Sequence, residues 1–468
     1  MDMCHGPLFS KVVRFSVPLM LTGMLQLLFN AVDLVVIGQY APGTAMAAVG
    51  STTALNSLVL NVFIGISVGA NVVAARSFGA GDRKSMTRIV HTAMLTAVSG
   101  GLVLTAVGIL IAEPALRLMG TPPEVLPLAA LYIRICFGAI PFIMIYNFGC
   151  ALLRAVGDTQ RPLCYLIIAG VVNVLLNLFL VIVCHLDVEG VAVATAVSHG
   201  IAALFILTAL LRNRNACRLK LRLLTAAFDG GAFRSMLVIG IPAGLQSSCF
   251  SISNMTIQST INSFGWTAMA GSAAAVGLEG IAYTGSYAYH QTAISFVAQN
   301  MGGGKYKRII RSLVWCFIGG AVCCGGVGAL IALNGRFLLS LFSPDPDIIA
   351  WGMVRLRIVC GTYFLCGFMD AASGGLRGLG YSTLSTLNSL AGACGIRILW
   401  IATVVRCHHT FETLLISYPV SWTVTTVAAT VMLTVILRKM IRIRIQRRSE
   451  WQGLKPGFPR GVRFLGIK

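Results

Sequence analysis

An aspartate lies in the middle of an otherwise apolar stretch near the start of the chain, QLLFNAVDLVVIGQ (26–39). A carboxylate at the centre of a bilayer-spanning helix costs about 2.5–3.5 kcal/mol on insertion scales, so Asp33 marks a candidate functional site. Gln26, Asn30 and Asp33 are spaced four and three residues apart and share one face of a helix. Oxygen atoms on this face suit a hard cation, and Asp33 also suits a proton.

Two later apolar segments supply amide and hydroxyl groups for the same site. Asn173 and Asn177 are one helical turn apart in NVLLNLFLV, and Thr195 lies in GVAVATAVSHG. We predict a cation-coupling site composed of Asp33, Asn30, Asn173, Asn177 and Thr195. The alternative is that the two asparagines only join helices by hydrogen bonds, worth about 0.6–2 kcal/mol each.

The second half of the chain carries two more acids within apolar segments, Glu279 and Asp370. The stretch LEGIAYTGSYAYHQ (278–291) places Glu279 on one helical stripe with two tyrosines and a histidine. An acid among aromatic rings attracts an organic cation through charge and cation–π interaction. The predicted substrate-binding residues are Gln26, Asn147, Glu279, Tyr283, Tyr287, His290 and Asp370. A packed face with satisfied hydroxyl groups is the alternative.

These polar residues are embedded in a chain of 468 residues that is 56% hydrophobic and only 11% charged. Soluble proteins carry about 25% charged residues, so too few charges are present to cover a water-facing surface. Apolar runs of about 20 residues, the length that spans a bilayer, recur from end to end. We predict an all-α polytopic membrane protein with about twelve transmembrane helices. A β-barrel is disfavoured, because its strands alternate with period two.

The net charge of +21 arises mainly from short loops and from the segment RKMIRIRIQRR (438–448). Basic loops such as AGDRKSMTR (80–88) follow the even-numbered predicted helices, and the positive-inside rule then places both termini in the cytoplasm. We therefore expect a multi-pass protein of the plasma (inner) membrane, in contact with lipid. Aromatic residues are not interleaved with the basic ones, which argues against nucleic acid as a partner.

An internal repeat organises the chain. LRAVG begins at Leu153 and recurs as LRGLG at Leu376, and GAGDRK begins at Gly79 and recurs as GGGKYK at Gly302, with an identical separation in both pairs. A constant shift predicts two six-helix repeats related by a pseudo-two-fold axis along the membrane normal, an architecture in which transporters bind substrate between the halves. The predicted domains are an N-lobe (1–211), a basic cytoplasmic linker (212–234), a C-lobe (235–440) and a basic cytoplasmic tail (441–468).

Signatures of nucleotide hydrolysis and of metal-dependent catalysis do not occur in the sequence. It has no Walker motif, no H-E-x-x-H and no kinase signature, and its fourteen cysteines show no paired C-x-x-C spacing. We expect no enzyme activity and no cofactor. Active transport by such a chain requires an ion gradient, of protons or of sodium.

Several motifs in a fixed order resemble those of the multidrug and toxic compound extrusion (MATE) transporters. The motifs that carry the resemblance are VPLMLTGMLQLLFNAVDLVVIGQ (17–39), GAGDRK (79–84), LLRAVGDTQRP (152–162), NVLLNLFLV (173–181), GVAVATAVSHG (190–200) and VAQNMGGGK (297–305). The resemblance implies a secondary active antiporter with a V-shaped cavity between two bundles. Such a protein exports amphipathic, often cationic compounds in exchange for protons or sodium by alternating access.

By position, Asp33 matches the carboxylate in helix 1 of this family, and Asn173 and Thr195 match polar residues of its N-lobe cation site. Two departures leave the coupling ion open. One branch of the family carries an aspartate where this chain has Asn177, and sodium-coupled members carry an acid in helix 7, whereas 235–262 has none here.

Two other functions compete with drug efflux. A flippase for lipid-linked saccharides or peptidoglycan precursors of the same superfamily needs arginines in its cavity, whereas we expect Arg134, Arg355 and Arg357 to snorkel at helix ends. An intramembrane enzyme needs paired acids or a metal cluster, whereas the three acids here are scattered over three predicted helices. We expect a monomer that takes small-molecule substrates.

Overall fold

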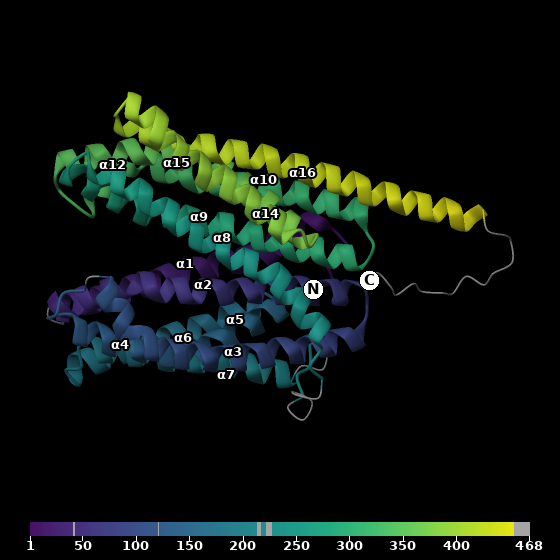
Figure 1. Ribbon diagram of the computed structural model, residues 1–468, viewed down its shortest axis with the longest axis horizontal. Helices are drawn as coiled ribbons and strands as arrows, with labels where there is room; N and C mark the ends of the chain where they lie inside the picture. The colour runs from purple at the N-terminus through teal and green to yellow at the C-terminus, as the bar shows by residue number, and fades with distance from the viewer. Residues whose placement is uncertain (41–42, 120, 213–216, 221–226, 454–468) are drawn as a thin grey trace.

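The computed structural model describes residues 1–40, 43–119, 121–212, 217–220 and 227–453, and its regular elements in these ranges are all helical. The helices form two layers, and the chain completes one layer, the N-lobe, before it enters the other, the C-lobe (Figure 1). The N-lobe contains α1 (Leu8–Tyr40), α2 (Gly43–Gly79), α3 (Arg83–Leu118), α4 (Leu126–Gly138), α5 (Ile140–Ala155), α6 (Gln160–Leu178) with the π-helix η1 (Phe179–Val183), and α7 (Val188–Arg212). The C-lobe contains α8 (Gly230–Asn262), α9 (Trp266–Gly302), α10 (Tyr306–Leu333), α11 (Gly335–Ser340), α12 (Pro346–Val359) with η3 (Cys360–Thr362), α13 (Tyr363–Gly378), α14 (Ser382–Ser389) with η4 (Leu390–Gly395), α15 (Ile396–Trp400) with η5 (Ile401–Val405), and α16 (Phe411–Gly453).

Ten helical segments in the described part of the chain are long and apolar enough to cross a membrane, and the bent pair α4–α5 forms an eleventh. The bend of 43° lies just before Pro141, which has no N–H to donate into the preceding turn. α9 is 37 residues long but is not one of the ten, and it lies in the middle of the C-lobe with α10, α12 and α13 around it. The chain is a polytopic helical membrane protein, as predicted.

The duplication predicted from the sequence recurs in the helix boundaries. The first residues of α3 and α10 have the same separation in the sequence as the repeated motifs. The same separation relates the first residues of α5 and α13 and those of α7 and α16. The turns repeat as well, because Gly81 and Gly304 have φ of 71° and 65°, and Gly157 and Gly380 have φ of 85° and 87°. Glycine adopts these angles without the penalty that a Cβ atom brings. The two lobes therefore share their turns as well as their helices.

The lobes meet at one end of the molecule, which we call the closed end. There α2 and α8 pack so closely that their backbones meet at Gly65, Gly69, Gly240 and Gly244. A Cβ atom added at Gly69 would overlap with the carbonyl oxygen of Met236. Small residues allow such close approach, and van der Waals packing then holds helices together in a membrane where apolar surface gains nothing over lipid.

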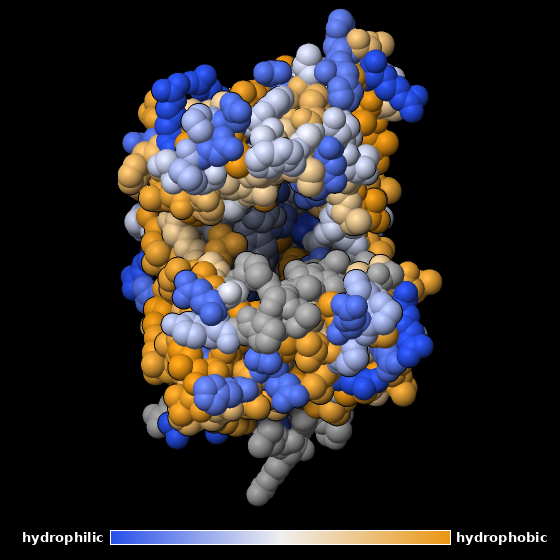
Figure 2. All heavy atoms as spheres, turned by 90° about the vertical axis from the view of Figure 1, so that its left-hand side faces the viewer, coloured by the Kyte–Doolittle hydropathy of each residue, from blue (hydrophilic) through white to orange (hydrophobic). Residues whose placement is uncertain are grey.

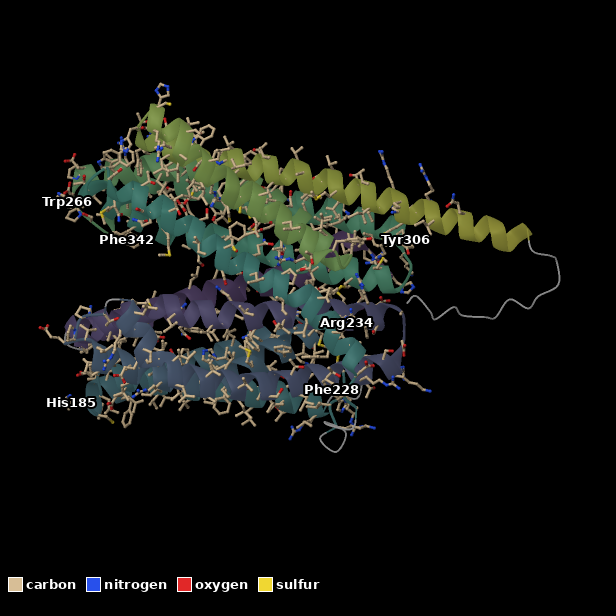
Figure 3. All side chains as sticks on the ribbon, viewed as in Figure 1. His185, Phe228, Arg234, Trp266, Tyr306 and Phe342 are labelled. Atoms are coloured by element: carbon tan, nitrogen blue, oxygen red, sulfur yellow. The ribbon has the colours of Figure 1, made fainter. Side chains whose placement is uncertain are left out.

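A hollow separates the lobes at the opposite end, which we call the open end (Figure 2). His185, Trp266 and Phe342 lie at the open end, whereas Arg234 and Tyr306 lie at the closed end (Figure 3). The molecule therefore consists of two lobes that are joined at one end and diverge toward the other.

α1 contacts both lobes. Toward the closed end it packs against α9, where the rings of Phe15 and Phe296 are 5.7 Å apart, and Gly23 lies against Thr284. Farther along, α1 packs against α6, where the ring of Phe29 lies against Gly170. This one helix therefore connects the C-lobe with the interior of the N-lobe.

The predicted domain boundaries lie close to helix ends. α7 ends at Arg212 and α8 begins at Gly230, so the C-lobe helices start slightly before the predicted boundary at 235. Within the predicted linker, residues 213–216 and 221–226 lie outside the described residues. α16 continues to Gly453, so the first part of the predicted tail is helical, and residues 454–468 lie outside the described residues.

The close contact between α2 and α8 leads to a stability prediction. Gly69→Ala should lower the Tm of the purified protein by several degrees, because overpacking of this kind costs about 1–3 kcal/mol. Gly277→Ala is the matched control, since it lies mid-helix in α9 and an added Cβ meets open space. Equal Tm values for the two variants would show that the lobes do not depend on this contact.

Candidate functional site

A chain of hydrogen bonds links Asp33 in α1 to α6 and α7. Asn177 Nδ2 donates to Asp33 Oδ1 and also to Asn173 Oδ1 at 3.3 Å. Asn173 Nδ2 in turn donates to Thr195 Oγ1 at 3.5 Å. Four of the five predicted cation-coupling residues therefore meet on three different helices.

One oxygen in this cluster has no partner. Asn177 is fully buried, and its Nδ2 serves two acceptors, so the orientation of the amide is defined by its neighbours. Its Oδ1 is buried without a hydrogen bond from any described residue. Because a buried polar atom without a partner is costly, this oxygen suits a hydrogen-bond donor or a small cation, whereas the Asp33 carboxylate in the same cluster suits a proton or a cation. The π-helix η1 begins two residues after Asn177, and such segments frequently occur at functional sites.

Asn30 and Gln26 do not join this cluster. Both side chains are exposed on α1, and no hydrogen bond connects either of them to Asp33 or Asn177 in the described part of the chain. They share a helix face with Asp33, as the spacing predicts, but their side chains lie outside the hydrogen-bonded cluster.

Glu279, predicted to bind substrate, is paired with an arginine inside the C-lobe. Its carboxylate forms a bidentate salt bridge with Arg355, with Nε to Oε1 at 2.7 Å and Nη2 to Oε2 at 3.0 Å. Arg355 Nη1 also donates to Ser272 Oγ at 2.9 Å, and the residues of the ion pair are only 7% and 3% exposed. The prediction that Arg355 snorkels at a helix end is wrong, because α12 packs directly on α9 and turns this side chain into the lobe. Glu279 is already neutralised and is not a free acid for a cation.

Asp370 belongs to a network that joins α9, α13 and α8. Ser286 Oγ donates to Asp370 Oδ2 at 2.7 Å, and His290 Nδ1 lies 2.8 Å from the carbonyl oxygen of Asp370. A carbonyl only accepts, so His290 carries its proton on Nδ1, and its Nε2 accepts from Arg377 Nη1 at 3.1 Å. Arg377 Nη2 donates to Gln246 Oε1 at 2.7 Å. Asp370, unlike Glu279, has no ion-pair partner within 4 Å among the described residues.

The two predicted tyrosines lie on the exposed side of α9. Tyr283 is 49% exposed and Tyr287 is 37% exposed, and Tyr287 accepts a hydrogen bond at 3.0 Å from Gln291. His290 on the same stripe is buried. The predicted stripe therefore has two parts: the tyrosines are exposed, and the histidine belongs to the network around Asp370. Asn147 donates to the carbonyl oxygen of Ile143, one turn earlier on its own helix.

Two buried arginines, Arg377 and Arg397, are not among the site residues predicted from the sequence. Arg377 is the arginine of the repeat motif LRGLG, which served only as a landmark of the duplication. Arg397 lies over the rings of Tyr418 and Trp422, at 4.3 Å and 6.0 Å from their centres. Neither arginine has a carboxylate within 4 Å in the described part of the chain, and no group of three His, Cys, Asp or Glu side chains there could hold a metal.

Two repeated helical lobes around a hollow, with isolated acids at membrane depth, define a membrane transporter. The family model described as MatE matches residues 18–179 and 242–402, one match in each lobe. The chain therefore belongs to the MatE family of multidrug and toxic compound extrusion transporters, and it is a transporter and not an enzyme.

Known relatives cover most of this chain. It is similar to the probable multidrug resistance protein YpnP of Bacillus subtilis, with 29% identity over 381 residues that make up 81% of this chain and 84% of that protein. It is also similar to an FAD transporter of Shewanella oneidensis, with 27% identity over 74% of this chain and 78% of that protein. Among solved structures, the outward-facing conformation of a multidrug resistance MATE family transporter superposes with a TM-score of 0.87 at 20% identity, covering 94% of this chain and 98% of that one, which shows the shared fold.

The salt bridge between Glu279 and Arg355 predicts a recovery in a double variant. Glu279→Leu or Arg355→Met alone should destabilise the protein by about 3–5 kcal/mol, because each leaves a buried charge without a partner. The double variant should regain most of the lost Tm in detergent. If Glu279 instead served only a substrate, Glu279→Leu would change drug binding and leave the Tm unchanged.

Proposed function

We propose that this chain exports amphipathic, often cationic compounds in exchange for protons or sodium by alternating access. The observation that carries the proposal is the hydrogen bond from Asn177 Nδ2 to the Asp33 carboxylate, in a cluster where the buried Oδ1 of Asn177 has no partner among the described residues. The names of the relatives support export of drug-like compounds, since they include a probable multidrug resistance protein and the multidrug export protein MepA of Staphylococcus aureus.

The ion acts through the bond between Asp33 and Asn177. A proton or cation on the Asp33 carboxylate removes its negative charge and changes how strongly it holds the amide on α6. Because α1 also packs against α9, a shift of α1 relative to α6 reaches the C-lobe. Ion and drug can exchange only if they favour opposite states of the lobes, since a ligand shifts an equilibrium by its differential affinity alone.

The substrate binds in the hollow beside α9. Asp370 supplies a carboxylate without an ion-pair partner among the described residues, and Tyr283 and Tyr287 supply exposed aromatic rings on the adjacent helix. A carboxylate and aromatic faces together attract an amphipathic cation. Glu279 does not contribute charge, because Arg355 neutralises it.

The closed end faces the cytoplasm in this proposal. The basic turns 79–84 and 302–308 both lie there, and the positive-inside rule assigns such turns to the cytoplasmic side of a plasma membrane. The N-terminus then lies in the cytoplasm, and the hollow opens outward, ready to release drug. The protein acts as a monomer, with the whole pathway between its own two lobes.

An anionic substrate is a second candidate, favoured by Arg377 and Arg397. The argument against a lipid-linked flippase assumed that the arginines snorkel at helix ends, whereas Arg355 and these two residues are buried. Arg377 and Arg397 lack carboxylate partners in the described part of the chain and would complement a carboxylate or phosphate. The FAD transporter among the relatives is consistent with such chemistry.

Asp33→Asn should abolish gradient-driven efflux without unfolding the protein, because asparagine keeps the shape but neither binds a proton nor carries charge. The measurement uses purified protein in liposomes loaded with a fluorescent organic cation, under a proton gradient and then a sodium gradient. Asp187→Asn removes an acid outside the predicted spans and should leave efflux unchanged. Efflux at the wild-type rate in Asp33→Asn would refute the coupling role.

Asp370→Asn should weaken binding of an organic cation about tenfold or more and raise its KM, because it removes the one carboxylate proposed for the substrate. Binding to the purified protein is measured by fluorescence titration with a cationic and an anionic dye of similar size. Stronger binding of the anionic dye, lost in Arg377→Gln and retained in Asp370→Asn, would instead establish the second candidate.

A further inference from the structure

The closed end contains two contacts between the lobes that are related by the duplication. Gln299 Nε2, from the C-lobe, donates to the carbonyl oxygen of Ala155 at 2.9 Å. Arg76 Nη2, from the N-lobe, donates to the carbonyl oxygen of Gly378 at 3.3 Å. The shift between the repeats takes Arg76 to Gln299 and Ala155 to Gly378. Each lobe therefore holds the last carbonyl group of the equivalent helix, α5 or α13, in the other.

The backbones also cross at two equivalent glycines. A Cβ atom on Gly79 would overlap with the carbonyl oxygen of Gln299, and one on Gly302 would overlap with that of Arg76. The closed end is thus a paired gate, and the lobes cannot separate there without breaking both crossed contacts.

Residues 1–5, which we call the strap, lie on only one side of this symmetric gate. Gly157 lies against the backbone of Met1, whereas its equivalent Gly380 lies against the guanidinium of Arg76. Gln299 has a shorter side chain than Arg76, and the strap occupies the corresponding space. The N-terminus accordingly lies between the two lobes at the closed end (Figure 1).

The strap is bound to the C-lobe by a row of hydrogen bonds. Met3 N donates to Gln299 Oε1 at 2.7 Å, and Arg308 Nε donates to the carbonyl oxygen of Met3 at 2.8 Å. Lys305 Nζ donates to the carbonyl oxygen of Cys4 at 3.0 Å. Hydrogen bonds from charged donors are the stronger kind, worth about 1.5–3 kcal/mol.

The strap is bound to the N-lobe as well. The amine of Met1 donates to the carbonyl oxygen of Val156 at 2.8 Å, next to the carbonyl group that Gln299 holds. The side chain of Met3 is fully buried in an apolar cluster with Phe15 and Phe296. The strap therefore joins both lobes at the point where one of the two crossed contacts is made.

We propose that the strap is a gate element that stabilises the state closed at this end and must be released before the lobes separate here. It lies outside both segments that match the MatE family model, 18–179 and 242–402. The proposal requires only that the lobes alternate between two states, and it does not depend on which ion or drug drives them.

The test compares hydrogen–deuterium exchange in full-length variants held in lipid nanodiscs without ion gradient or drug. Arg308→Ala removes the two bonds that Arg308 makes to the strap, and Gln299→Ala removes a strap contact and a crossed contact together. Arg311→Ala is the matched control, because Arg311 is exposed on the same helix and makes no hydrogen bond to the described strap. Arg308→Lys keeps one charged donor and should give an intermediate effect.

In Arg308→Ala, backbone amides of 62–79 and 236–244 at the closed end should exchange about tenfold faster. A tenfold change in exchange rate corresponds to the loss of about one hydrogen bond from a charged group. Amides of 252–262 at the open end should exchange more slowly, because the lobes approach each other there. Gln299→Ala should show a larger shift in the same directions, and Arg311→Ala none. Faster exchange confined to the strap, or the same direction of change at both ends, would overturn the proposal, since it would mean fraying or general loss of stability.

Discussion

A charge inside a bilayer has to find its partners within the protein, because lipid offers none. The three acids of this chain at membrane depth meet that constraint in different ways. Glu279 is held by two of the three nitrogen donors of Arg355, whereas Asp33 is held by the neutral amide of Asn177 and Asp370 by a hydroxyl group. A carboxylate in a bidentate salt bridge cannot lose its charge without leaving a buried arginine unpaired. A carboxylate held by neutral groups can bind and release a proton or a cation, and this difference in partner is why Asp33 and Asp370, and not Glu279, are the acids proposed for transport.

The two lobes have equivalent helices and turns, and they differ in the side chains at equivalent positions. Asp370 stands where the N-lobe has Asn147, and Gln299 stands where the N-lobe has Arg76. Backbone features such as the turn glycines are kept because they depend on angles that glycine adopts most readily. Side chains face different partners in each lobe, so an ion site in one and a network of arginines in the other are compatible with one common frame.

The helices, their order and the repeat could be predicted because they depend on patterns that the sequence displays directly: apolar length, turn glycines and a constant shift between equivalent motifs. The cluster around Asp33 could also be predicted, because the spacing of its asparagines places them one helical turn apart on a single face. The pairing of Glu279 with Arg355 could not be predicted, because the two residues are 76 positions apart and no periodicity connects them. Arg355 resembles any arginine near a helix end until the packing of α12 on α9 is known.

α1 connects the proposed ion site with the proposed gate element. It is 33 residues long, so it spans about 50 Å, and it carries Asp33 near one end while the strap precedes the other. Its closed-end half packs on the C-lobe and its other half on the N-lobe. A displacement of α1 caused by a change of charge at Asp33 would also move the start of the strap relative to Val156 if it passes Pro18, which lies between them in α1. Ion binding and opening of the gate can thus be coupled through one element, without a separate relay between the sites.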